Sequence, residues 1–543
     1  MTTRPALVLA FAAAVLMLPS LVMGTLPSHS SMHNLTWSAQ FSEQVRAGIL
    51  YPRWLPQSFD GLGAPSFYFY PPLPFWLDAV LSVVTFDGVS TSYRLSLTAF
   101  VLLLLSGAGF HAWLRLQNAG PRAALVGAIA YMAAPYHLID HYIRGAFAEF
   151  AAYTTLPFVF CALALVARRH RLGGPALALA YAALVTSHLP TALLISVSAV
   201  PAYVLFIAWR ARTTDRWFLL RCVAGFALGL ALAALYLLPA LGLQNATLIE
   251  WLWTWGFRIQ DSYLLMPWRW VQGDDMLAMV WSVAGGALLA MLDLVFFTGL
   301  RQRRTEHADL VLWAAVTLAC LVLMSGAVPW QWLPLVSQVG FVWRLLIVVE
   351  FAAITALCLA PWADVDRSAG RLFLVAAIAL VPAIVIVGRD VVGRMELVAS
   401  GASMRWQDAR EYLPAGYPQQ PGVAYQDIGL ELVKEVPPIA CQPAARRCEA
   451  TPSPLGTLRI EVDSGQTTQV TVRRFAFPAW QLEPPTPIAA TERLRLVSFT
   501  APAGPHSFVL TRRTLPQERV GGWISAMSLI VLLGWSFAGR HRR

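Results

Sequence analysis

The chain of 543 residues is poor in charge, since only 13% of its residues are Asp, Glu, Lys or Arg, whereas 57% are hydrophobic. An average soluble domain has about twice that charged fraction. Apolar runs of about 20 residues, the length that crosses a bilayer, recur along most of the chain. The net charge of +10 comes almost entirely from arginines in short loops between these runs. This is the charge pattern of cytoplasmic loops in membrane proteins, so we expect no nucleic-acid partner.

Cysteines and recognisable catalytic motifs are also scarce. Of the six cysteines, four lie within apolar runs, where a small buried side chain is the simple interpretation. Cys441 and Cys448 lie in a polar segment and could pair if that segment is outside the cytoplasm. The sequence contains no metal-ligand spacing, phosphate-binding glycine loop or nucleophile elbow. We therefore assign no residues to a metal site. A divalent cation stays open as a possible cofactor.

The apolar runs predict the number of spans. Thirteen can be counted, from Pro5–Gly24 to Trp523–Phe537. Basic clusters such as Arg301–Arg304 should lie in the cytoplasm, and both chain ends carry such residues, so the number of crossings should be even. Pro74–Phe86 is short, follows two prolines and carries Asp78, so we expect it to lie at the interface. The expected fold is an α-helical polytopic membrane protein with about twelve spans.

Polar stretches divide the chain into three parts. Residues 1–388 form the membrane domain, with a large first outer loop at 25–73. Residues 389–519 form an extracytoplasmic domain, where period-two patterns such as 457–463 predict the antiparallel strands of a small β-sandwich. Residues 520–543 form a last spanning helix and a basic cytoplasmic tail. Nearly all distinctive polar and aromatic residues lie on the outer side, so we expect function there.

The first outer loop is long and rich in aromatic and apolar residues, which argues against disorder. We interpret it as a folded lid on the membrane surface. His33 is a candidate auxiliary base, and Arg53 is a candidate phosphate ligand. Trp54 and Tyr70 are candidate substrate contacts.

Ionisable residues also gather at 134–149. Asp140 and Arg144 are four residues apart, so they can share one face of a helix. Glu149 begins an apolar run, where a charge is costly and more often functional than not. The simpler interpretation is an interfacial helix with a satisfied salt bridge.

Two further polar residues lie near the ends of apolar runs. Arg344 is placed near the outer end of a span, where a guanidinium can grip phosphate oxygens or extend to the interface. Glu350, six residues on, should not face it directly. His188 lies between two apolar runs and is a candidate substrate contact, although a lone histidine there is more often a satisfied polar group.

Several short motifs carry a resemblance that spans nearly the whole chain. They are Gly48–Trp54, Gly61–Pro65, Phe69–Leu73, Ala134–Tyr136, Arg144–Ala146, Glu149, Ser187–Pro190, Val342–Leu346, Pro478–Trp480, Pro502–His506 and Ile524–Ser525. In this order they resemble a bacterial membrane-protein family labelled "6-pyruvoyl-tetrahydropterin synthase-related", a name that implies no pterin chemistry, and are similar to YfhO-like proteins. That family resembles the GT-C superfamily of membrane glycosyltransferases.

The resemblance implies transfer of a sugar from a polyprenyl-phosphate donor to an envelope glycan, lipid or protein on the outer face of the inner membrane. A carboxylate would act as general base on the acceptor hydroxyl. Arg or His would neutralise the departing phosphate, with Arg53, Arg144 and Arg344 as candidates. The lipid chain of the donor would bind among membrane lipids in a groove between spans.

One departure from the family pattern concerns the expected loop acid. Relatives tend to place an Asp just before the loop histidine, whereas this chain has His29, Ser30 and Ser31 ahead of His33. Either Asp140 or Glu149 supplies the carboxylate, or His33 serves as base, or transferase activity is lost. The alternative functions are a non-catalytic scaffold that works with envelope-glycan assembly proteins, and a carrier of lipid-linked glycans.

Overall fold

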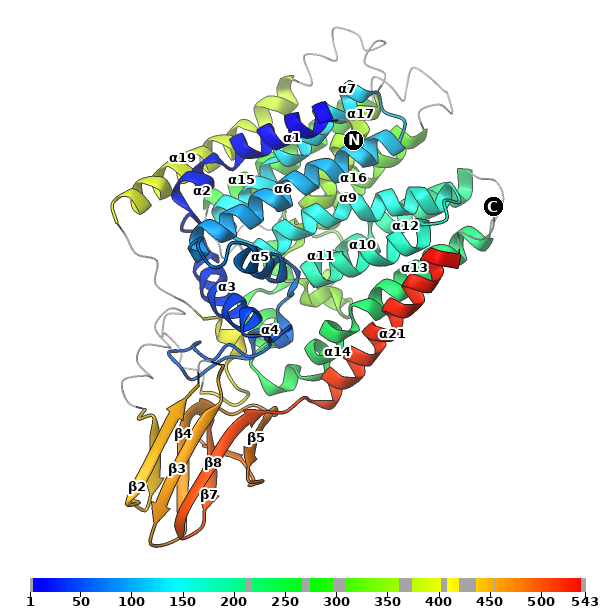
Figure 1. Ribbon diagram of the computed structural model, residues 1–543. Coiled ribbons are helices and arrows are strands. Elements are labelled where there is room, and N and C mark those ends of the chain that lie inside the picture. The colour runs from blue at the N-terminus through cyan, green and yellow to red at the C-terminus, as the bar shows by residue number, and fades with distance from the viewer. Residues whose placement is uncertain are drawn as a thin grey trace.

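The computed structural model describes residues 3–210, 216–265, 274–295, 308–360, 374–401, 408–418, 436–453 and 455–538. A helical body takes up most of the chain, and a smaller β region lies at one end of it (Figure 1). The expected helical membrane fold with a β-rich region near the C-terminus is confirmed. The basic cluster Arg301–Arg304 lies outside the described residues.

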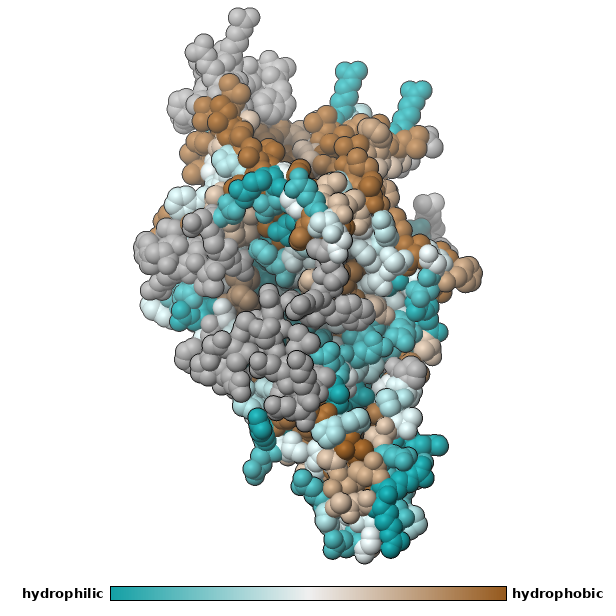
Figure 2. Space-filling view, turned by 90° about the vertical axis from the view of Figure 1, so that its left-hand side faces the viewer, coloured by the Kyte–Doolittle hydropathy of each residue, from teal (hydrophilic) through white to brown (hydrophobic). Residues whose placement is uncertain are grey.

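The apolar runs form helices, because a backbone that is surrounded by lipid must satisfy its hydrogen bonds internally. The described helices are α1 (Thr3–Leu16), α2 (Leu18–Met23), α3 (Ser31–Arg46), α4 (Ser66–Phe69), α5 (Leu73–Val84), α6 (Thr91–Leu116), α7 (Pro121–Met132), α8 (Pro135–Ile139), α9 (Phe147–Ala167), α10 (Gly173–Ser187), α11 (Leu189–Val197), α12 (Ala199–Arg210), α13 (Arg216–Leu232), α14 (Ala234–Gly242), α15 (Asp274–Leu294), α16 (Ala308–Ser325), α17 (Leu346–Leu359), α19 (Val381–Ala399) and α21 (Pro516–Ala538). Apolar surface gathers over the upper, helical part of the molecule in Figure 2.

Nine helices within the described ranges are long and apolar enough to cross a membrane. The number rises to ten if the bent pair Trp217–Leu232 and Ala234–Gly242, which are at 66° to each other, forms one span. Helices α1 and α10 are shorter apolar helices beside them. Counting both would give the expected twelve, and that number stays a prediction.

Helix α5 has 12 residues and corresponds to the segment that we expect at the interface. At a rise of about 1.5 Å per residue it is too short for a bilayer core of about 30 Å. Its Asp78 is fully buried and accepts hydrogen bonds from Arg94 Nε at 3.1 Å and Ser38 Oγ at 2.5 Å. Because an unpaired buried charge is costly, this pairing ties α5 to α3 and α6.

The β region consists of two antiparallel four-stranded sheets. Its strands are β1 (Ile439–Gln442), β2 (Arg447–Pro452), β3 (Leu458–Ser464), β4 (Thr468–Phe475), β5 (Trp480–Glu483), β6 (Ala489–Ala490), β7 (Leu496–Ala501) and β8 (Gly504–Arg512). The strand orders are β1-β4-β7-β6 and β2-β3-β8-β5. Strand β3 alternates as its sequence predicts, with Leu458, Ile460 and Val462 buried.

Two contacts join the sheets. The rings of Phe499 and Phe508 lie 4.9 Å apart, edge to face, in the apolar core. Cys441 of β1 and Cys448 of β2 form a disulfide, which links one sheet to the other. The pairing that the sequence leaves open is therefore present in the structure.

The two expected domain boundaries, at 388/389 and 519/520, both fall inside helices. Helix α19 continues to Ala399 and α21 begins at Pro516. Polar residues in the second half of α19, among them Arg389, Asp390 and Arg394, end the apolar run before the helix itself ends, so the sequence places the boundary too early. The first outer loop is partly helical, since it contains α3 and α4.

The first outer loop packs between the helical body and the β region (Figure 1). Trp54 contacts Trp480 edge to face, with ring centroids 4.9 Å apart. The Phe475 N–H donates to the Leu62 carbonyl at 2.9 Å. Buried Arg474 donates through Nη1 to the Pro56 carbonyl at 3.0 Å. The loop and the β region therefore form a continuous hydrophobic core.

Asp408 joins this junction from the other side, where its Oδ2 accepts the Phe59 N–H at 2.6 Å. Burial raises the pKa of Asp408 from 3.8 to about 6, and the nearby charge of Asp60 acts in the same direction. A raised carboxyl pKa means that the protonated form stabilises the fold. That contribution is complete below pH 3.8 and is lost as the pH rises through about 6.

We expect Asp408→Asn to melt at a higher temperature than wild type at about pH 7.5, and the difference to vanish near about pH 4. The carboxamide oxygen can still accept the Phe59 N–H, while no charge is buried. Thermal unfolding of the detergent-solubilised protein measures both values. Glu492→Gln, at an exposed acid in the loop before β7, is the control. A wild-type melting temperature that is the same at both pH values would contradict the assignment.

Candidate functional site

The segment 135–146 forms an irregular helical corner at the end of a span. Helix α8 passes directly into one π-helical turn, Asp140–Arg144, and Gly145 ends it in the left-handed conformation with φ +59°. Such wide turns often occur at functional sites. The turn is closed by a salt bridge between Arg144 Nη1 and Asp140 Oδ1, so the expected pairing of these side chains is present.

Glu149, at the start of α9, is a buried charge with three partners. Its Oε2 contacts Arg144 Nη1 at 2.9 Å and Arg344 Nε at 3.1 Å. Its Oε1 accepts the hydroxyl of Tyr136 at 2.7 Å. Only 1% of its side chain is exposed, and a carboxylate at this depth needs such partners to remain charged.

A second buried carboxylate, Glu350 of α17, supports the same corner. It accepts the Tyr136 backbone N–H and the Tyr153 hydroxyl, both at 2.7 Å. His137 stacks on the Tyr153 ring with centroids 4.0 Å apart. Arg344 and Glu350 therefore bind different partners, and Glu350 fixes the Tyr136 that in turn contacts Glu149.

Asp140 differs from both glutamates because one of its oxygens is unused. Its Oδ2 is buried and has no hydrogen-bond partner among the described residues, and the same is true of Asn34 Oδ1. Both residues line a cavity of about 30 Å³ together with Ser28 and Ser31 of the first outer loop. That volume is about the share of one water molecule. A ligand that donates hydrogen bonds would satisfy both oxygens.

The first outer loop is hydrogen-bonded to this corner. The His29 N–H donates to the Ile143 carbonyl at 3.1 Å, and the Ser30 N–H to the Arg144 carbonyl at 2.9 Å. Asn34 Nδ2 donates to the Gly145 carbonyl at 2.7 Å. The two stretches that the sequence analysis singles out separately therefore form one site.

The structure brings four predicted site residues into direct contact, namely Asp140, Arg144, Glu149 and Arg344. His188 lies within electrostatic reach of Glu149 and Arg344, and its Nδ1 is hydrogen-bonded to Thr191 Oγ1 at 2.7 Å. Tyr70 also lies within electrostatic reach of this group. Burial raises the pKa of Tyr70, and the nearby charge of Arg344 opposes that rise.

Three predicted residues lie elsewhere. His33 contacts the Trp37 ring at 5.6 Å and is not among the residues that line the small cavity. Arg53 is buried, donates to the Leu235 carbonyl at 2.6 Å and lies 3.8 Å from Glu518. Trp54 packs against the β region. Their expected roles in catalysis and substrate binding stay predictions.

Sequence reasoning missed several members of the site, among them Asn34, Tyr136 and Tyr153. It also missed Arg394 of α19, which donates to the Pro27 carbonyl. Burial lowers the pKa of His29, and the positive charges of Arg394 and Arg144 lower it further. The sequence shows Asp140 and Arg144 as a charged pair at helical spacing. It does not show that α19 packs beside the turn that contains them.

No group of three or more His, Cys, Asp or Glu side chains is arranged to hold a metal ion in the part of the chain that the structure describes. The two oxygens that face the small cavity come from Asp140 and Asn34. We therefore derive no chemical step through a cation.

Fold and site define a polytopic membrane protein with a buried, charged site where its spans meet the first outer loop. The chain belongs to the 6-pyruvoyl-tetrahydropterin synthase related family, described as membrane proteins, whose model matches residues 67–397. The family expected from the sequence is thus confirmed. A search of curated proteins gives no match.

Among solved structures, a cryo-electron-microscopy structure of a mutant arabinofuranosyltransferase AftD from Mycobacteria is similar, with a TM-score of 0.43 and 18% identity. The match covers 72% of this chain and 28% of that chain. This chain therefore matches less than a third of the length of that protein.

Gly145 offers a test of the contact between the loop and the corner. A Cβ at Gly145 would overlap Ser28 Oγ and lie 3.0 Å from the Ser31 backbone nitrogen. We expect Gly145→Ala to lower the melting temperature strongly and to increase proteolysis of the loop. Gly48→Ala is the matched control, because Gly48 also has a positive φ but no atom within 4 Å of the added Cβ. The control should lower the free energy of unfolding only through its backbone strain, by about 1–3 kcal/mol. Equal effects of the two substitutions would contradict the proposed contact.

Proposed function

We propose that the protein is a membrane glycosyltransferase that transfers a sugar from a polyprenyl-phosphate donor to an envelope glycan, lipid or protein on the outer face of the bacterial inner membrane. The unpaired oxygen of Asp140 is the observation that carries this proposal. It faces a cavity between the spans and the first outer loop. The Cys441–Cys448 disulfide supports an oxidising compartment for the β region.

Asp140 has the arrangement of a general base. Arg144 holds Oδ1, which leaves Oδ2 to accept a proton from a hydroxyl in the cavity. The acceptor oxygen forms a bond to the anomeric carbon as its proton passes to Asp140. The bond between that carbon and the phosphate oxygen breaks, and the polyprenyl phosphate leaves with the electron pair.

We assign the departing phosphate to Arg344, which shares Glu149 with Arg144 although it does not line the small cavity. Its Nε contacts Glu149 and its Nη1 donates to the Val339 carbonyl, while its side chain is 15% exposed. Its Nη2 keeps donors that can bind phosphate oxygens, and a guanidinium stabilises the charge that develops there. Both carboxylate oxygens of Glu149 already have partners. We therefore assign Glu149 the role of positioning Arg144 and Arg344 rather than that of a base.

A non-catalytic scaffold for envelope-glycan assembly is the second candidate function. The cavity at Asp140 has a volume of about 30 Å³, which leaves no room for a sugar unless the first outer loop moves. The absence of an acid directly before His33 in the sequence also favours this candidate. Transport of a lipid-linked glycan ranks below both, because the polar residues gather on one side of the spans rather than at the bilayer centre.

The deciding experiment measures incorporation of radiolabel into membranes from a panel of polyprenyl-phosphate sugars. We expect Asp140→Asn to lower transfer by about 10²- to 10⁴-fold, the usual contribution of a general base. Its melting temperature should change less than that of Glu149→Gln, because Arg144 keeps Glu149 as a partner. Glu149→Gln should instead lower the melting temperature together with activity, because it removes the carboxylate that Arg144 and Arg344 share.

Asp275→Asn is the control, since Asp275 is an exposed acid that pairs with exposed Arg389. Its transfer rate should equal that of wild type. Full activity of Asp140→Asn would exclude Asp140 as the base. No transfer by wild type from any donor, with an envelope defect in the deletion strain, would favour the scaffold.

A further inference from the structure

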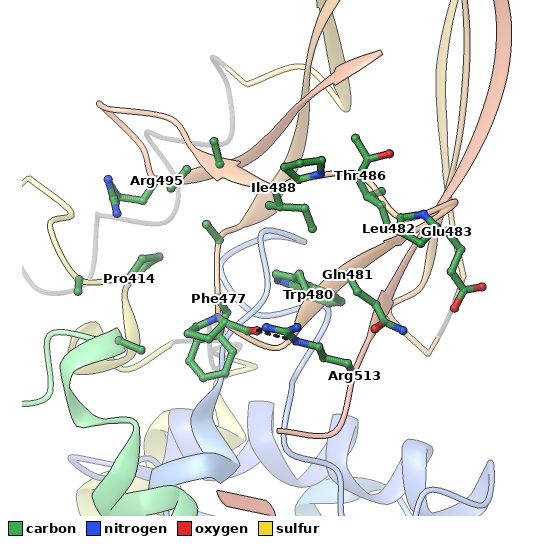
Figure 3. A pocket seen from close by; sticks show the side chains of 18 of the residues that line it. Pro414, Phe477, Trp480, Gln481, Leu482, Glu483, Thr486, Ile488, Arg495 and Arg513 are labelled. Carbon is green, nitrogen blue, oxygen red and sulfur yellow. Dashed lines mark hydrogen bonds between the residues drawn. The ribbon is translucent and has the colours of Figure 1, made fainter. Parts of the chain in front are cut away.

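A cavity of about 1020 Å³ lies where the β region meets the helical body. Its lining includes β5, the segment before β6, Asn245 and Ala246. Pro414 lies across the cavity from Thr486 and Leu482 (Figure 3). Pockets that bind ligands typically measure about 300–1,000 Å³. This cavity is far larger than the one at Asp140, and no step of the proposed transfer uses it.

The lining combines two kinds of side chain. Pro485, Pro487 and Ile488 offer apolar C–H surface. Asn245, Gln481 and Thr486 offer amide and hydroxyl groups that both donate and accept hydrogen bonds. A ligand with many hydroxyl groups and apolar ring faces matches both properties, and this is the chemistry of a saccharide.

Two arginines and one glutamate give the cavity a positive balance. Arg495 and Arg513 lie at its wall, against Glu483 at the far side (Figure 3). The guanidinium of Arg513 donates from Nε and Nη2 to the Pro478 carbonyl at 3.3 and 3.2 Å, which fixes its position. The charge favours an anionic ligand over a neutral or cationic one.

Arg495 is held in a conformation that needs an explanation. Its φ is +57°, which is unfavourable for any residue but glycine, and its buried Nε has no hydrogen-bond partner within the described ranges. Its backbone is fixed, because its carbonyl accepts the Ala476 N–H at 2.7 Å and its N–H donates to the Thr491 carbonyl at 3.2 Å. These bonds and the one from the Thr491 N–H to the Leu496 carbonyl at 2.9 Å close the turn between β6 and β7. The turn thus accounts for the φ of Arg495 and places this residue at the cavity wall.

We propose that this cavity binds an acidic oligosaccharide, with Arg495 contacting a carboxylate of the sugar. The amide and hydroxyl side chains bind its hydroxyl groups, and the proline-rich segment packs against its ring faces. This binding requires no sugar transfer, so it holds for the transferase and for the scaffold alike. Its failure would leave the role of Asp140 untouched.

The test uses the full-length protein in detergent and isothermal titration with a uronic-acid tetrasaccharide, with a neutral tetrasaccharide of the same length as the comparison. We expect the acidic sugar to bind and the neutral one to bind far more weakly. Arg495→Gly removes the guanidinium and also the backbone strain, so it should weaken binding about 10- to 100-fold, the usual range for a charged hydrogen bond, at an equal or higher melting temperature. Arg459→Ala removes an exposed positive charge of β3 away from the cavity and should change nothing.

Glu483→Gln gives an independent result of opposite sign. It removes the one negative charge of the wall and should tighten binding of the acidic sugar, most clearly at low ionic strength. Three outcomes would overturn the proposal: no binding of the acidic sugar, equal affinity for the neutral one, or equal affinity of Arg495→Gly and wild type. Displacement of the sugar by anionic phosphatidylglycerol vesicles would assign the cavity to lipid headgroups instead.

Discussion

The need to pair the buried charge of Glu149 determines the geometry of the site. A carboxylate among membrane spans costs several kcal/mol unless guanidinium and hydroxyl groups surround it, about 3–5 kcal/mol being lost when one partner of such a pair is removed. Here the partners come from two distant segments, since Arg144 and Tyr136 belong to the helical corner and Arg344 to the turn just before α17. Meeting this requirement fixes the corner, the turn before α17 and the start of α9 relative to one another. It also leaves Asp140 beside the cavity with a single arginine.

The first outer loop extends this rigid centre to the β region. One part of it is hydrogen-bonded to the carbonyls of Ile143, Arg144 and Gly145, and a later part packs its Trp54 against Trp480. A segment held at both ends cannot move away from the site without breaking contacts at the β region. The cavity at Asp140 therefore depends on packing at the β region, and we infer that the β region is a structural part of the site rather than a separate attachment.

Local signals account for what the sequence predicts correctly. Hydropathy defines the helices and period-two alternation the strands, because each reflects burial along a single element. Asp140, Arg144 and Glu149 are recognisable as candidates since charges beside apolar runs are rare. The roles of Arg53 and Trp54 are not recognisable, because their partners Leu235 and Trp480 lie far along the chain and tertiary packing alone brings them together. Asn34 and Arg394 were missed for the same reason.

The first outer loop has no acid directly before His33. What the chemistry requires is a carboxylate oxygen that faces the acceptor, and the segment that provides it is secondary. In this chain the loop contributes the hydroxyls of Ser28 and Ser31 to the cavity, while the carboxylate enters from the π-helical turn on the opposite wall. The number of partners separates the two candidate acids, because every oxygen of Glu149 is occupied and one of Asp140 is not. We propose that Asp140 takes the place of the loop acid, because the wide turn sets this carboxylate beside the loop.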